Sequence, residues 1–482
     1  MNNFSLKVLA HAQTHPNKIA IVDSRCTVTY KDLSTYIKKF SDYLKSNRLS
    51  PGDRVIICMD DCVEWCVSFL SCIQLGLVPV GISTQLPTVK LLQTIEDCDA
   101  KCLIVQTHIT NDIIEIIRDT ILLLGTNDPL VAYDAYDYHP DEFCFWTISS
   151  GTSGEQKYAV HRHDNLINLY NMVITAFDIN RHSVIYSTPK LSFSYGLNLI
   201  LNYGLGAGAT VILSDKVITQ KLILNLVTQY NITHFYTTPR VVRMLLKDSK
   251  QHNELNNLKV MACAGEVLPI DIAKLFEQMY NIHILEGYGL VEALSYVTTQ
   301  TNNDKKHGTM GKPLDSIVCE VRDSNGTVCA REQIGELYIK TPCSATLYWN
   351  NWSKTKQVFV GDWIKTNDMV YTDNDNNLVY VGRLDDLAKI NGFFVSPIEI
   401  ENAIMTFDGV DDCLVTINNN EGFNTITAKI ILAPNTRFDA GELRRYLKGI
   451  LESFKIPKYF KLVESLPLTI TNKKIRKLEI VS

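Results

Sequence analysis

The chain has 482 residues, which is more than one hydrophobic core normally supports, so we expect at least two domains. Hydrophobic residues make up 46% of the chain and charged residues 21%, a composition typical of soluble globular proteins and not of membrane-embedded or disordered ones. The net charge is only −5 and no long basic run occurs. This argues against nucleic acid as a partner and favours a small-molecule substrate.

The amino-terminal region and the cysteines both predict a cytoplasmic protein. Residues 1–18 lack the charged start and apolar core of a signal peptide, and no later run is long enough to predict a membrane span. The 13 cysteines are scattered without a paired framework, which fits reduced thiols. Cys58, Cys62 and Cys66 recur every four residues and would share one face of a helix. Because no further ligand is close in sequence, burial in a core is favoured over a metal site.

The order of predicted elements indicates an α/β fold with a smaller second domain. From about residue 27 to 285, apolar strands such as "RVIICM" and "THFYTT" alternate with helical stretches, which predicts α/β layers with largely parallel sheets. From about 293 to 382, short strands separated by Asn, Asp and Gly predict a small β-rich, barrel-like subdomain. A mixed α+β pattern then returns. We therefore predict a large N-terminal domain, residues 1–384, and a small mobile C-terminal domain, residues 385–482.

The segment "SSGTSGEQK", residues 149–157, has the composition of a phosphate-binding loop. Glycines allow backbone N–H groups to converge on an anion, hydroxyls add donors, and lysine supplies a positive charge. The loop follows the apolar strand "FCFWTI" and precedes the helical pattern "HDNLINLYNMVITAF", so we expect it at the carboxyl end of a strand. The alternative is a polar surface turn, which the loop alone does not exclude.

Further motifs follow this loop in a recognisable order. They are "CAGEVLP", "EGYGLVEAL", the long stretch from "TNDMVYTD" to "SPIEIE", and "PLTITNKKIR" near the end of the chain. Together with the loop, this series resembles the acyl-adenylate-forming superfamily, which includes acyl-CoA and aryl-CoA synthetases and adenylation domains. Within it, "TPKLSFSYGLN" and "ACAGEVLP" are most similar to the benzoate:CoA ligase branch, which acts on aromatic carboxylic acids.

The resemblance implies two half-reactions and their cofactors. ATP and Mg²⁺ would activate an aromatic acid to an acyl-AMP, and coenzyme A would then accept the acyl group. Both halves bring anions together, so catalysis would depend on neutralising charge and on positioning. A rival interpretation is a free-standing enzyme that loads the phosphopantetheine thiol of a separate carrier protein. A third is a regulatory protein that binds an adenylate with little turnover. The sequence does not decide the oligomeric state.

The family pattern assigns roles to individual residues of this chain. The implied catalytic residues are Lys473, Glu292 and Thr152, with Glu292 as the metal ligand. The implied ATP and AMP contacts are Ser150, Gly151, Thr152, Ser153, Gly154, Lys157, Ala264, Gly265, Glu266, Gly287, Tyr288, Gly289, Asp368 and Arg383. The implied acyl pocket comprises Ser194, Tyr195, Gly196, Gly287, Ser295 and Tyr296. Asp385 would be the hinge, and Lys389, Gly392 and Phe393 would line the thiol tunnel.

The chain departs from the family pattern at several of these motifs. Val291 stands where the family has a threonine that contacts the α-phosphate, and restoring that one hydrogen bond is worth up to roughly tenfold in rate. Four other differences are Gln156 and Tyr158 beside the lysine of the loop, and Asn367 and Asn472 in place of glycines. Asn tolerates left-handed backbone better than most residues, so we expect the last two to be accommodated.

The acyl-pocket residues predict the class of aromatic acid. Ser295 and Tyr296 stand where the benzoate branch has a histidine and an aliphatic residue, so this pocket is expected to carry extra hydroxyl groups. A site built to bond a substrate hydroxyl rejects analogues that lack it. We therefore predict a monocyclic aromatic acid with a hydroxyl or amino group. Core packing is the alternative role of both Tyr195 and Tyr296.

Overall fold

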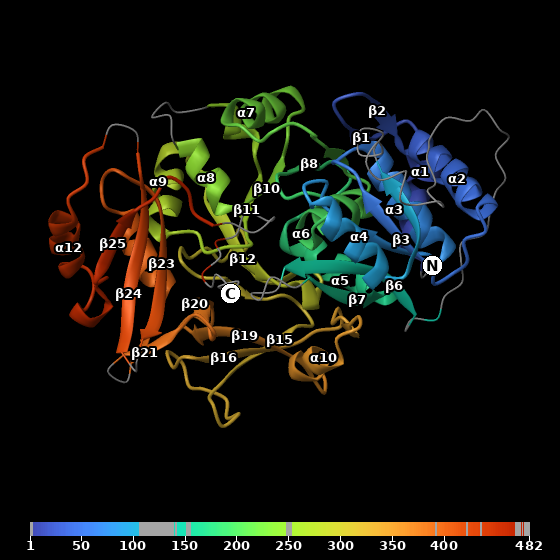
Figure 1. Cartoon of the computed structure of the whole chain (residues 1–482). Helices are drawn as coiled ribbons and strands as arrows, with labels where there is room; N and C mark the ends of the chain where they lie inside the picture. Colours follow the sequence, from blue (N-terminus) through green and yellow to red (C-terminus); the bar gives the residue numbers. More distant parts are fainter. Residues whose placement is uncertain are drawn as a thin grey trace. The chain divides into compact units, whose positions relative to one another are not determined.

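The computed structural model describes most of the chain in two compact units. The described residues are 3–105, 139, 142–150, 156–246, 253–390, 393–420, 423–433, 436–467, 474 and 476. The first unit comprises the described parts of 1–149, 156–318 and 340–364, and the second those of 150–155, 319–339 and 365–482. Figure 1 shows the helices and strands along the chain. The predicted boundary between residues 384 and 385 remains a prediction.

A nine-stranded sheet forms the centre of the first unit. Six of its strands, from β12 to β1, run parallel to one another, and antiparallel strands close both edges. In sheet order the strands are β14 (Lys312–Pro313), β13 (Tyr296–Thr299), β12 (Ile284–Gly289), β11 (Val260–Cys263), β10 (His234–Thr237), β8 (Val184–Ser187), β9 (Thr210–Ile212), β1 (Ile19–Val22) and β2 (Thr27–Thr29). This agrees with the predicted α/β layers.

Three amphipathic helices cover one face of this sheet. They are α7 (Gln220–Gln229), α8 (Pro239–Leu246) and α9 (Ile270–Tyr280), which Figure 1 shows beside β10 and β11. Their apolar residues share one core with the strands, in which Val227, Leu245 and Phe276 are almost fully buried. The short helix α6 (Ser194–Leu197) leads into a π-helix at residues 198–204, which packs near β8.

A six-stranded sheet carries the start of the predicted phosphate loop. Its strands, in order, are β17 (Leu347–Tyr348), β7 (Gln156–Arg162), β6 (Phe143–Ser150), β4 (Val78–Gly81), β3 (Arg54–Cys58) and β5 (Ala100–Val105). Strand β6 agrees with the predicted strand "FCFWTI". Strand β7, which the sequence pattern did not indicate, follows the loop. The loop therefore joins two neighbouring strands before α5 (His163–Ala176) begins.

The amino-terminal helices pack against one another beside these strands. They are α1 (Phe4–Thr14), α2 (Tyr30–Ser46) and α3 (Val63–Leu75). Helix α2 begins at a capping box in which Thr29 and Asp32 exchange hydrogen bonds. Cys58, Cys62 and Cys66 do not lie on one helix, because Cys58 ends β3 and Cys62 is the N-cap residue of α3; all three are buried, as expected for core residues.

Most of the later strands form separate small sheets. A five-stranded sheet has the order β15-β16-β19-β18, with β20 paired to β19. A β21–β22 hairpin and a three-stranded β23-β24-β25 sheet follow. The strands are β15 (Val318–Arg322), β16 (Gly335–Lys340), β18 (Phe359–Val360), β19 (Trp363–Thr372), β20 (Leu378–Arg383), β21 (Ala388–Ile390), β22 (Phe393–Val395), β23 (Val410–Asn420), β24 (Phe423–Leu432) and β25 (Tyr459–Leu462).

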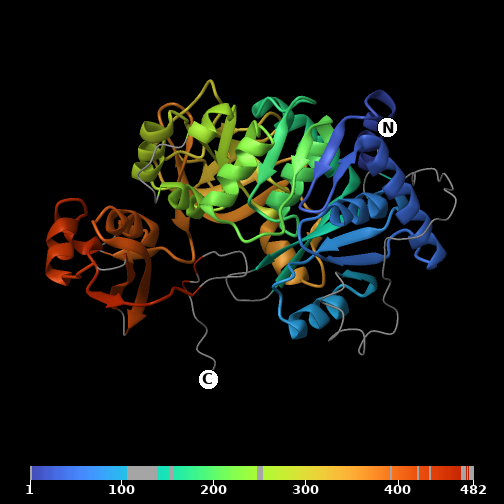
Figure 2. The same cartoon turned by 90° about the horizontal axis from the view of Figure 1, so that it is seen from above.

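The carboxy-terminal part of the second unit has its own core. Helices α11 (Pro397–Met405) and α12 (Ala440–Lys448) pack with the β23-β24-β25 sheet, drawn in orange and red in Figure 2. Ile400, Val415 and Leu443 are fully buried there. A small α+β layer of this kind agrees with the predicted carboxy-terminal domain. Among the residues described, no helix combines the length and the apolarity that crossing a membrane requires.

Candidate functional site

The backbone places the predicted phosphate loop between two strands. Ser150 ends β6, and Lys157 is the second residue of β7. Gly151, Thr152, Ser153 and Gly154 lie outside the described residues. The Lys157 ammonium lies over the ring of Tyr348, with 5.8 Å from Nζ to the ring centroid.

Tyr348 connects the phosphate-loop lysine to the predicted metal ligand. Its hydroxyl donates a hydrogen bond to Oε1 of Glu292. Strand β17 pairs antiparallel with β7, so Tyr348 lies opposite Ala159, two residues beyond Lys157. An ammonium, a phenol and a carboxylate from three distant segments therefore meet at one place. The sequence analysis missed Tyr348, since nothing within "TLYWN" identifies strand β17 as a partner of β7.

The turn that carries Glu292 is held through its backbone. Ala345 donates its N–H to the carbonyl of Glu292 at 2.7 Å. His161 Nε2 lies 3.0 Å from the carbonyl of Val291, while Asn165 donates to His161 Nδ1 at 3.1 Å. The Asn165 donor therefore assigns the histidine proton to Nε2, which donates to Val291. Burial lowers the pKa of His161 to about 3, so the ring is neutral.

Val291 has a packing role that the sequence did not predict. Its side chain packs, partly buried, against the apolar cluster of Ala159, Ala345 and Tyr348. A threonine hydroxyl at this position would have to be accommodated beside that cluster. Valine is therefore part of the support for Tyr348, and the gain expected from restoring the threonine is opposed by a packing cost.

The predicted adenine segments lie at the ends of two parallel strands. Ala264, Gly265 and Glu266 follow β11, and Gly287, Tyr288 and Gly289 end β12, which pairs with β11 through Cys263 and Glu286. Parallel neighbours bring these two ends to the same edge of the sheet. Two of these positions require glycine, each for a different structural reason. Gly265 has a φ of +92°, whereas a Cβ on Gly287 would lie 2.5 Å from the Tyr296 ring.

The predicted acyl-pocket residues form a network of hydroxyl groups. The hydroxyls of Tyr195 and Tyr296 lie 2.7 Å apart, and Tyr203 donates to Ser295 at 2.8 Å. The buried hydroxyl of Tyr236 has no hydrogen-bond partner among the described residues. Burial raises the pKa of each of these tyrosines, and electrostatic coupling links Tyr236 to Tyr296 and to Tyr203. The phenols are therefore neutral donors.

Two further members of this set are explained by the short helix α6. Ser194 begins the helix and is half-buried, and its carbonyl accepts a hydrogen bond from Asn198. Gly196 is buried, and a Cβ there would lie 2.2 Å from the carbonyl oxygen of Lys190. Glycine is therefore required by backbone packing at that position, whatever ligand lies nearby.

In the second unit, the predicted ribose residues face each other across a hairpin. Asp368 on β19 pairs with Arg383 on β20, and their side chains meet at 3.4 Å between Oδ1 and Nη1. Tyr380 donates its hydroxyl to the same Oδ1 at 3.2 Å. Asp368 is 5% exposed, so its charge is buried beside a cation and a phenol. Tyr380 is a second residue that sequence reasoning missed; its register partner is Val370, two residues from Asp368 on β19.

The predicted hinge residue has a partner at a position where the chain departs from the family. Asn367 donates its side-chain amide to Oδ2 of Asp385 at 2.6 Å. Its φ is +65°, the left-handed conformation that asparagine was expected to tolerate there. The carbonyl of Asn367 also accepts the N–H of Leu384 at 2.9 Å. Asn367 thus contacts Leu384 through its backbone and the predicted hinge residue Asp385 through its side chain.

Two of the predicted thiol-tunnel residues belong to a short hairpin. Lys389 lies on β21 and Phe393 on β22, and the paired backbones bring Ile390 opposite Phe393. Gly392 lies outside the described residues, as do Lys473 and Asn472.

Comparison with known proteins identifies the family. The sequence pattern described as AMP-binding enzyme matches residues 8–349, and the pattern described as AMP-binding enzyme C-terminal domain matches residues 399–473. The chain is an AMP-binding enzyme.

Similar proteins cover nearly the whole of this AMP-binding enzyme. A benzoate–CoA ligase of Thauera aromatica is 29% identical over 483 residues, covering 95% of this chain and 91% of the relative. A crystal structure of an anthranilate CoA ligase in complex with anthranoyl-AMP has a TM-score of 0.91 at 25% identity, covering 98% of this chain and 96% of the other. A benzoate CoA ligase from Burkholderia xenovorans LB400 has a TM-score of 0.90 at 27% identity, covering 98% and 100%.

The terminal loop of this AMP-binding enzyme is anchored on the carboxyl side of Lys473. Lys474 donates to Asp412 at 2.7 Å and to the carbonyl of Cys413 at 2.6 Å. Arg476 forms a two-point ion pair with Glu401, including a contact of 2.9 Å from Nη2 to Oε2. Lys474 is therefore engaged within its own unit, and the catalytic role of Lys473 stays a prediction.

Proposed function

We propose that this AMP-binding enzyme activates an aromatic carboxylic acid with ATP and transfers the acyl group to coenzyme A. The observation that carries the proposal is the meeting of Lys157, Tyr348 and Glu292 in one unit. The Asp368–Arg383 pair in the other unit supports it. These residues supply a phosphate cation, a metal ligand and a ribose acceptor in an enzyme whose relatives include benzoate–CoA and anthranilate CoA ligases.

The first half-reaction forms a bond between a carboxylate oxygen and the α-phosphorus of ATP. The bond from the α-phosphorus to the bridging oxygen breaks, and pyrophosphate leaves with the electron pair. Lys157 and the loop of Ser150, Gly151, Thr152, Ser153 and Gly154 would bind the β- and γ-phosphates. Lys473 would neutralise the charge shared by the carboxylate and the α-phosphate as they approach each other.

Glu292 fits a magnesium ion by the chemistry of its surroundings. Its carboxylate is a hard oxygen donor, and the phenol of Tyr348 occupies only Oε1 among the contacts described. Held there, Mg²⁺ would neutralise phosphate charge. The carboxylate is oriented by Tyr348, and its backbone is held by Ala345. The protein therefore supplies a ligand whose direction is set before the nucleotide arrives.

The nucleoside would be held by the remaining predicted contacts. Asp368 would accept hydrogen bonds from the ribose hydroxyls, and Arg383 would donate to the same sugar. The residues proposed to line the adenine are Ala264, Gly265, Glu266, Gly287, Tyr288 and Gly289. Their backbone would provide a flat surface for the base, because the glycines present no Cβ.

The second half-reaction moves the acyl group from phosphate to sulfur. The thiol of coenzyme A loses its proton to solvent, and the sulfur attacks the carbonyl carbon. The bond from that carbon to the phosphate oxygen breaks, and AMP leaves with the electron pair. We assign the required domain movement to Asp385 as hinge, and the pantetheine passage to Lys389, Gly392 and Phe393. Gly392→Leu would then slow thiol transfer while pyrophosphate exchange remains near the wild-type rate.

We further propose an aromatic acid that carries a hydroxyl or amino group. The Tyr195–Tyr296 hydroxyl pair uses one proton in its own bond, which leaves a second O–H to donate elsewhere. The buried Tyr236 hydroxyl has no partner among the described residues, and Phe177 packs edge-on against the rings of both Tyr236 and Tyr296. A polar substituent that satisfied these groups would remove a desolvation cost that unsubstituted benzoate leaves in place.

The test of the overall function is ATP–pyrophosphate exchange followed by a choice of acceptor. The acids compared are benzoate, hydroxybenzoates, aminobenzoates, cinnamates and medium-chain fatty acids. We expect the highest kcat/KM for a hydroxy- or aminobenzoate, with thiol transfer to free coenzyme A. Preference for fatty acids would refute the aryl assignment, and transfer only to a carrier protein's phosphopantetheine would refute coenzyme A as acceptor.

The Tyr236 assignment has a matched control on the neighbouring strand. Tyr236 on β10 and Tyr186 on β8 are both buried, and neither hydroxyl has a partner among the described residues. Since Phe235 is the register partner of Tyr186, the two tyrosines point to opposite faces of the sheet. We expect Tyr236→Phe to lower kcat/KM for the substituted acid about tenfold and to leave benzoate unchanged. Tyr186→Phe should change neither, and equal effects in both variants would refute the assignment.

A further inference from the structure

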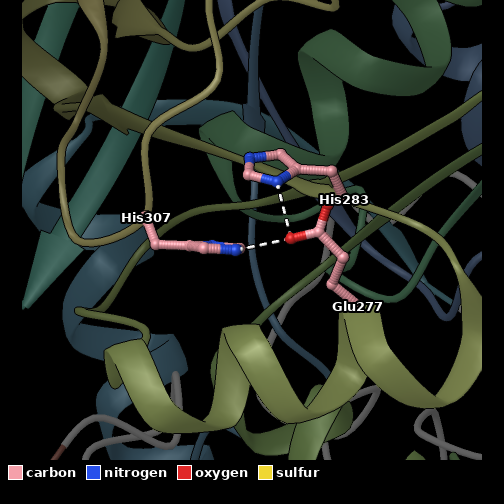
Figure 3. A group of neighbouring side chains, drawn as sticks. All are labelled: Glu277, His283 and His307. Carbon is pink, nitrogen blue, oxygen red and sulfur yellow. Dashed lines mark hydrogen bonds and ion pairs between the residues drawn. The ribbon is translucent and has the colours of Figure 1, made fainter.

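Two histidines and a glutamate that have no assigned part in the reaction gather in the first unit. Glu277 projects from α9, His283 lies just before β12, and His307 lies in the segment between β13 and β14 (Figure 3). His283 Nδ1 and His307 Nε2 lie 3.2 and 2.6 Å from the same oxygen, Oε2 of Glu277. The side chains are 5% exposed at His283 and 16% at His307. Among the described residues this is the only such group of histidine, cysteine and acidic side chains.

The neighbouring amide of Gln300 fixes the proton of His283. The Gln300 nitrogen donates to the carbonyls of Lys306 and Thr309 at 2.7 and 2.9 Å, so its oxygen is the atom that faces His283. That oxygen lies 2.9 Å from Nε2 of His283 and can only accept. The Nε2 atom therefore carries the proton. In the neutral ring, Nδ1 then presents a lone pair to the carboxylate of Glu277, an arrangement that is repulsive unless a cation lies between them.

The second histidine also lacks a complete set of hydrogen bonds. The Nδ1 atom of His307 is buried without a partner among the described residues, while its Nε2 faces Glu277. The two imidazole rings stack with centroids 4.4 Å apart and planes at 29°, which disfavours placing a positive charge on both. A single metal cation could accept one lone pair from each ring and one from the carboxylate, which would replace the repulsion at His283 by coordination and leave the proton of His307 on Nδ1.

We infer that Glu277, His283 and His307 form a binding site for one divalent transition-metal ion of the Zn²⁺ class. Two imidazole nitrogens and one carboxylate oxygen are a ligand set that Zn²⁺ favours, with open positions for water. The three ligand atoms lie within 4.8 Å of one another, with Oε2 of Glu277 at 3.2 Å from His283 Nδ1 and 2.6 Å from His307 Nε2. A tetrahedral ion with bonds of about 2.0–2.2 Å needs its ligand atoms roughly 3.3–3.5 Å apart, so binding would require His307 and Glu277 to separate by about 1 Å. The Gln300 contact orients one ligating ring from behind, as outer partners of metal-bound histidines do.

The site would act as a clamp within the first unit. It joins α9 to the chain entering β12 and to the segment that follows β13. Strand β12 ends in Gly287–Gly289, the proposed adenine segment, and β13 begins with Tyr296 of the proposed acyl set. A bound ion would thus stabilise the base of both segments without touching either substrate. It is distinct from the proposed magnesium site, because imidazole nitrogen is a poor ligand for Mg²⁺.

The experiment measures metal binding to the full chain after any histidine tag has been removed. Protein is stripped with a chelator, and binding is followed by equilibrium dialysis with Zn²⁺ and by the visible absorption of Co²⁺. We expect one tight equivalent, no displacement by millimolar Mg²⁺, and a higher Tm with Zn²⁺ present. Glu277→Gln and His307→Gln should each weaken binding at least about 100-fold.

The controls separate this site from adventitious binding. Cys26 is the one exposed thiol among the described cysteines, and His182 is an exposed histidine outside the cluster. Cys26→Ser and His182→Gln should bind Zn²⁺ as the wild type does. Circular dichroism and Tm without metal establish that Glu277→Gln is folded. The inference is overturned if the wild type binds no stoichiometric ion, if the cluster variants bind as tightly as the wild type, or if the controls lose the ion equally. None of these outcomes depends on ATP or on the proposed reaction.

Discussion

The ribose half of the proposed nucleotide-binding residues belongs to the second unit and the magnesium half to the first, and each is built in a different way. The ribose half uses a β-hairpin in which Asp368 and Arg383 are register partners. Tyr380, on the same strand as Arg383, donates its hydroxyl to the carboxylate of Asp368. The magnesium half uses a short irregular turn at Glu292. That turn is held by Tyr348 from one strand and by His161 and Ala345 through the backbone.

The ribose residues are held in place by contacts that are close in sequence, whereas the turn at Glu292 is held by contacts that are distant in sequence. A hairpin brings its functional pair together through neighbouring strands, so its geometry survives many changes elsewhere. The turn at Glu292 depends on residues that are more than 50 and 130 positions away in sequence, at Tyr348 and His161. Changes at the ribose half should therefore alter nucleotide binding alone, whereas changes at the magnesium half should also alter stability.

The largest effect is expected from the metal ligand itself. Glu292→Gln removes a hard anionic ligand while keeping the side-chain shape, so adenylation should fall roughly 10²–10³-fold. Pyrophosphate exchange measured across a range of Mg²⁺ concentrations checks this, and the variant should require more Mg²⁺. Tyr348→Phe keeps the carboxylate and should lose only about tenfold. Glu96→Gln on an exposed position of α4 (Thr88–Asp97) is the control, and an equal loss there would contradict the assignment.

The next effect is expected at the ribose aspartate. Asp368→Asn weakens hydrogen bonds to a charged acceptor, each worth about 1.5–3 kcal/mol, so the KM for ATP should rise roughly 10–100-fold. The turnover number should change less, because the reacting groups are untouched. Asp373→Asn is the matched control, since Asp373 is 6% exposed in the turn of the same hairpin. It should lower Tm with little change in KM, and a similar KM rise in both variants would argue against ribose binding.

A smaller effect, on stability, is expected at His161. His161→Gln disturbs buried hydrogen bonds to Val291 and Asn165 and should lower the free energy of unfolding by about 1–3 kcal/mol. Urea unfolding checks this.

The pH dependence of that stability has a definite sign. The pKa of His161 is about 3 in the folded chain, below the value of about 6.5 for an unfolded histidine. As pH falls below 6.5 the unfolded chain binds a proton that the folded chain does not. The wild type should therefore lose up to about 1.4 kcal/mol per pH unit through this residue. His161→Gln should show a shallower slope, part of which remains because burial also lowers the pKa of His163 to about 4.

The smallest effect is expected at the hinge contact. Asn367→Gly keeps the φ of +65° accessible and removes only the side-chain bond to Asp385. We expect thiol transfer from a preformed adenylate to speed up by about two- to fivefold relative to adenylation, as suits one exposed hydrogen bond. Asn376→Gly is matched in backbone, with a φ of +66°, but its side chain contacts Arg331. A change of equal size in Asn376→Gly would mean that general loosening of the hairpin is the cause.

Sequence reasoning was strongest where a motif is local. The layered α/β fold followed from alternating strands and helices, and the left-handed backbone at Asn367 followed from the residue type. Strand β7 was missed because it follows the loop at once and its polar start at Gln156 and Lys157 reads as loop. The assigned roles of the site residues stay predictions, and those of residues 151–154, 392 and 473 concern positions outside the described residues.

Long-range support could not be predicted, because pairing between distant segments leaves no local pattern. Tyr348 reaches Glu292 only through the pairing of β17 with β7, and Val291 packs on the cluster that this pairing creates. The same holds for the metal cluster, in which His307 is 30 positions from Glu277. A polar loop containing one histidine predicts nothing until a helix from another segment lies beside it.

The hydroxyl pair of Tyr195 and Tyr296 has one more consequence. Either oxygen can donate to the other across 2.7 Å, so the pair has two proton arrangements with the same heavy-atom positions. In one arrangement the outward proton belongs to Tyr195, and in the other to Tyr296. A ligand group that donates and one that accepts can then each be met by rotating hydroxyl protons, without moving a ring. If the proposed pocket binds phenolic or anilinic acids, the ring position of the substituent would therefore affect binding more than whether the substituent is a hydroxyl or an amino group.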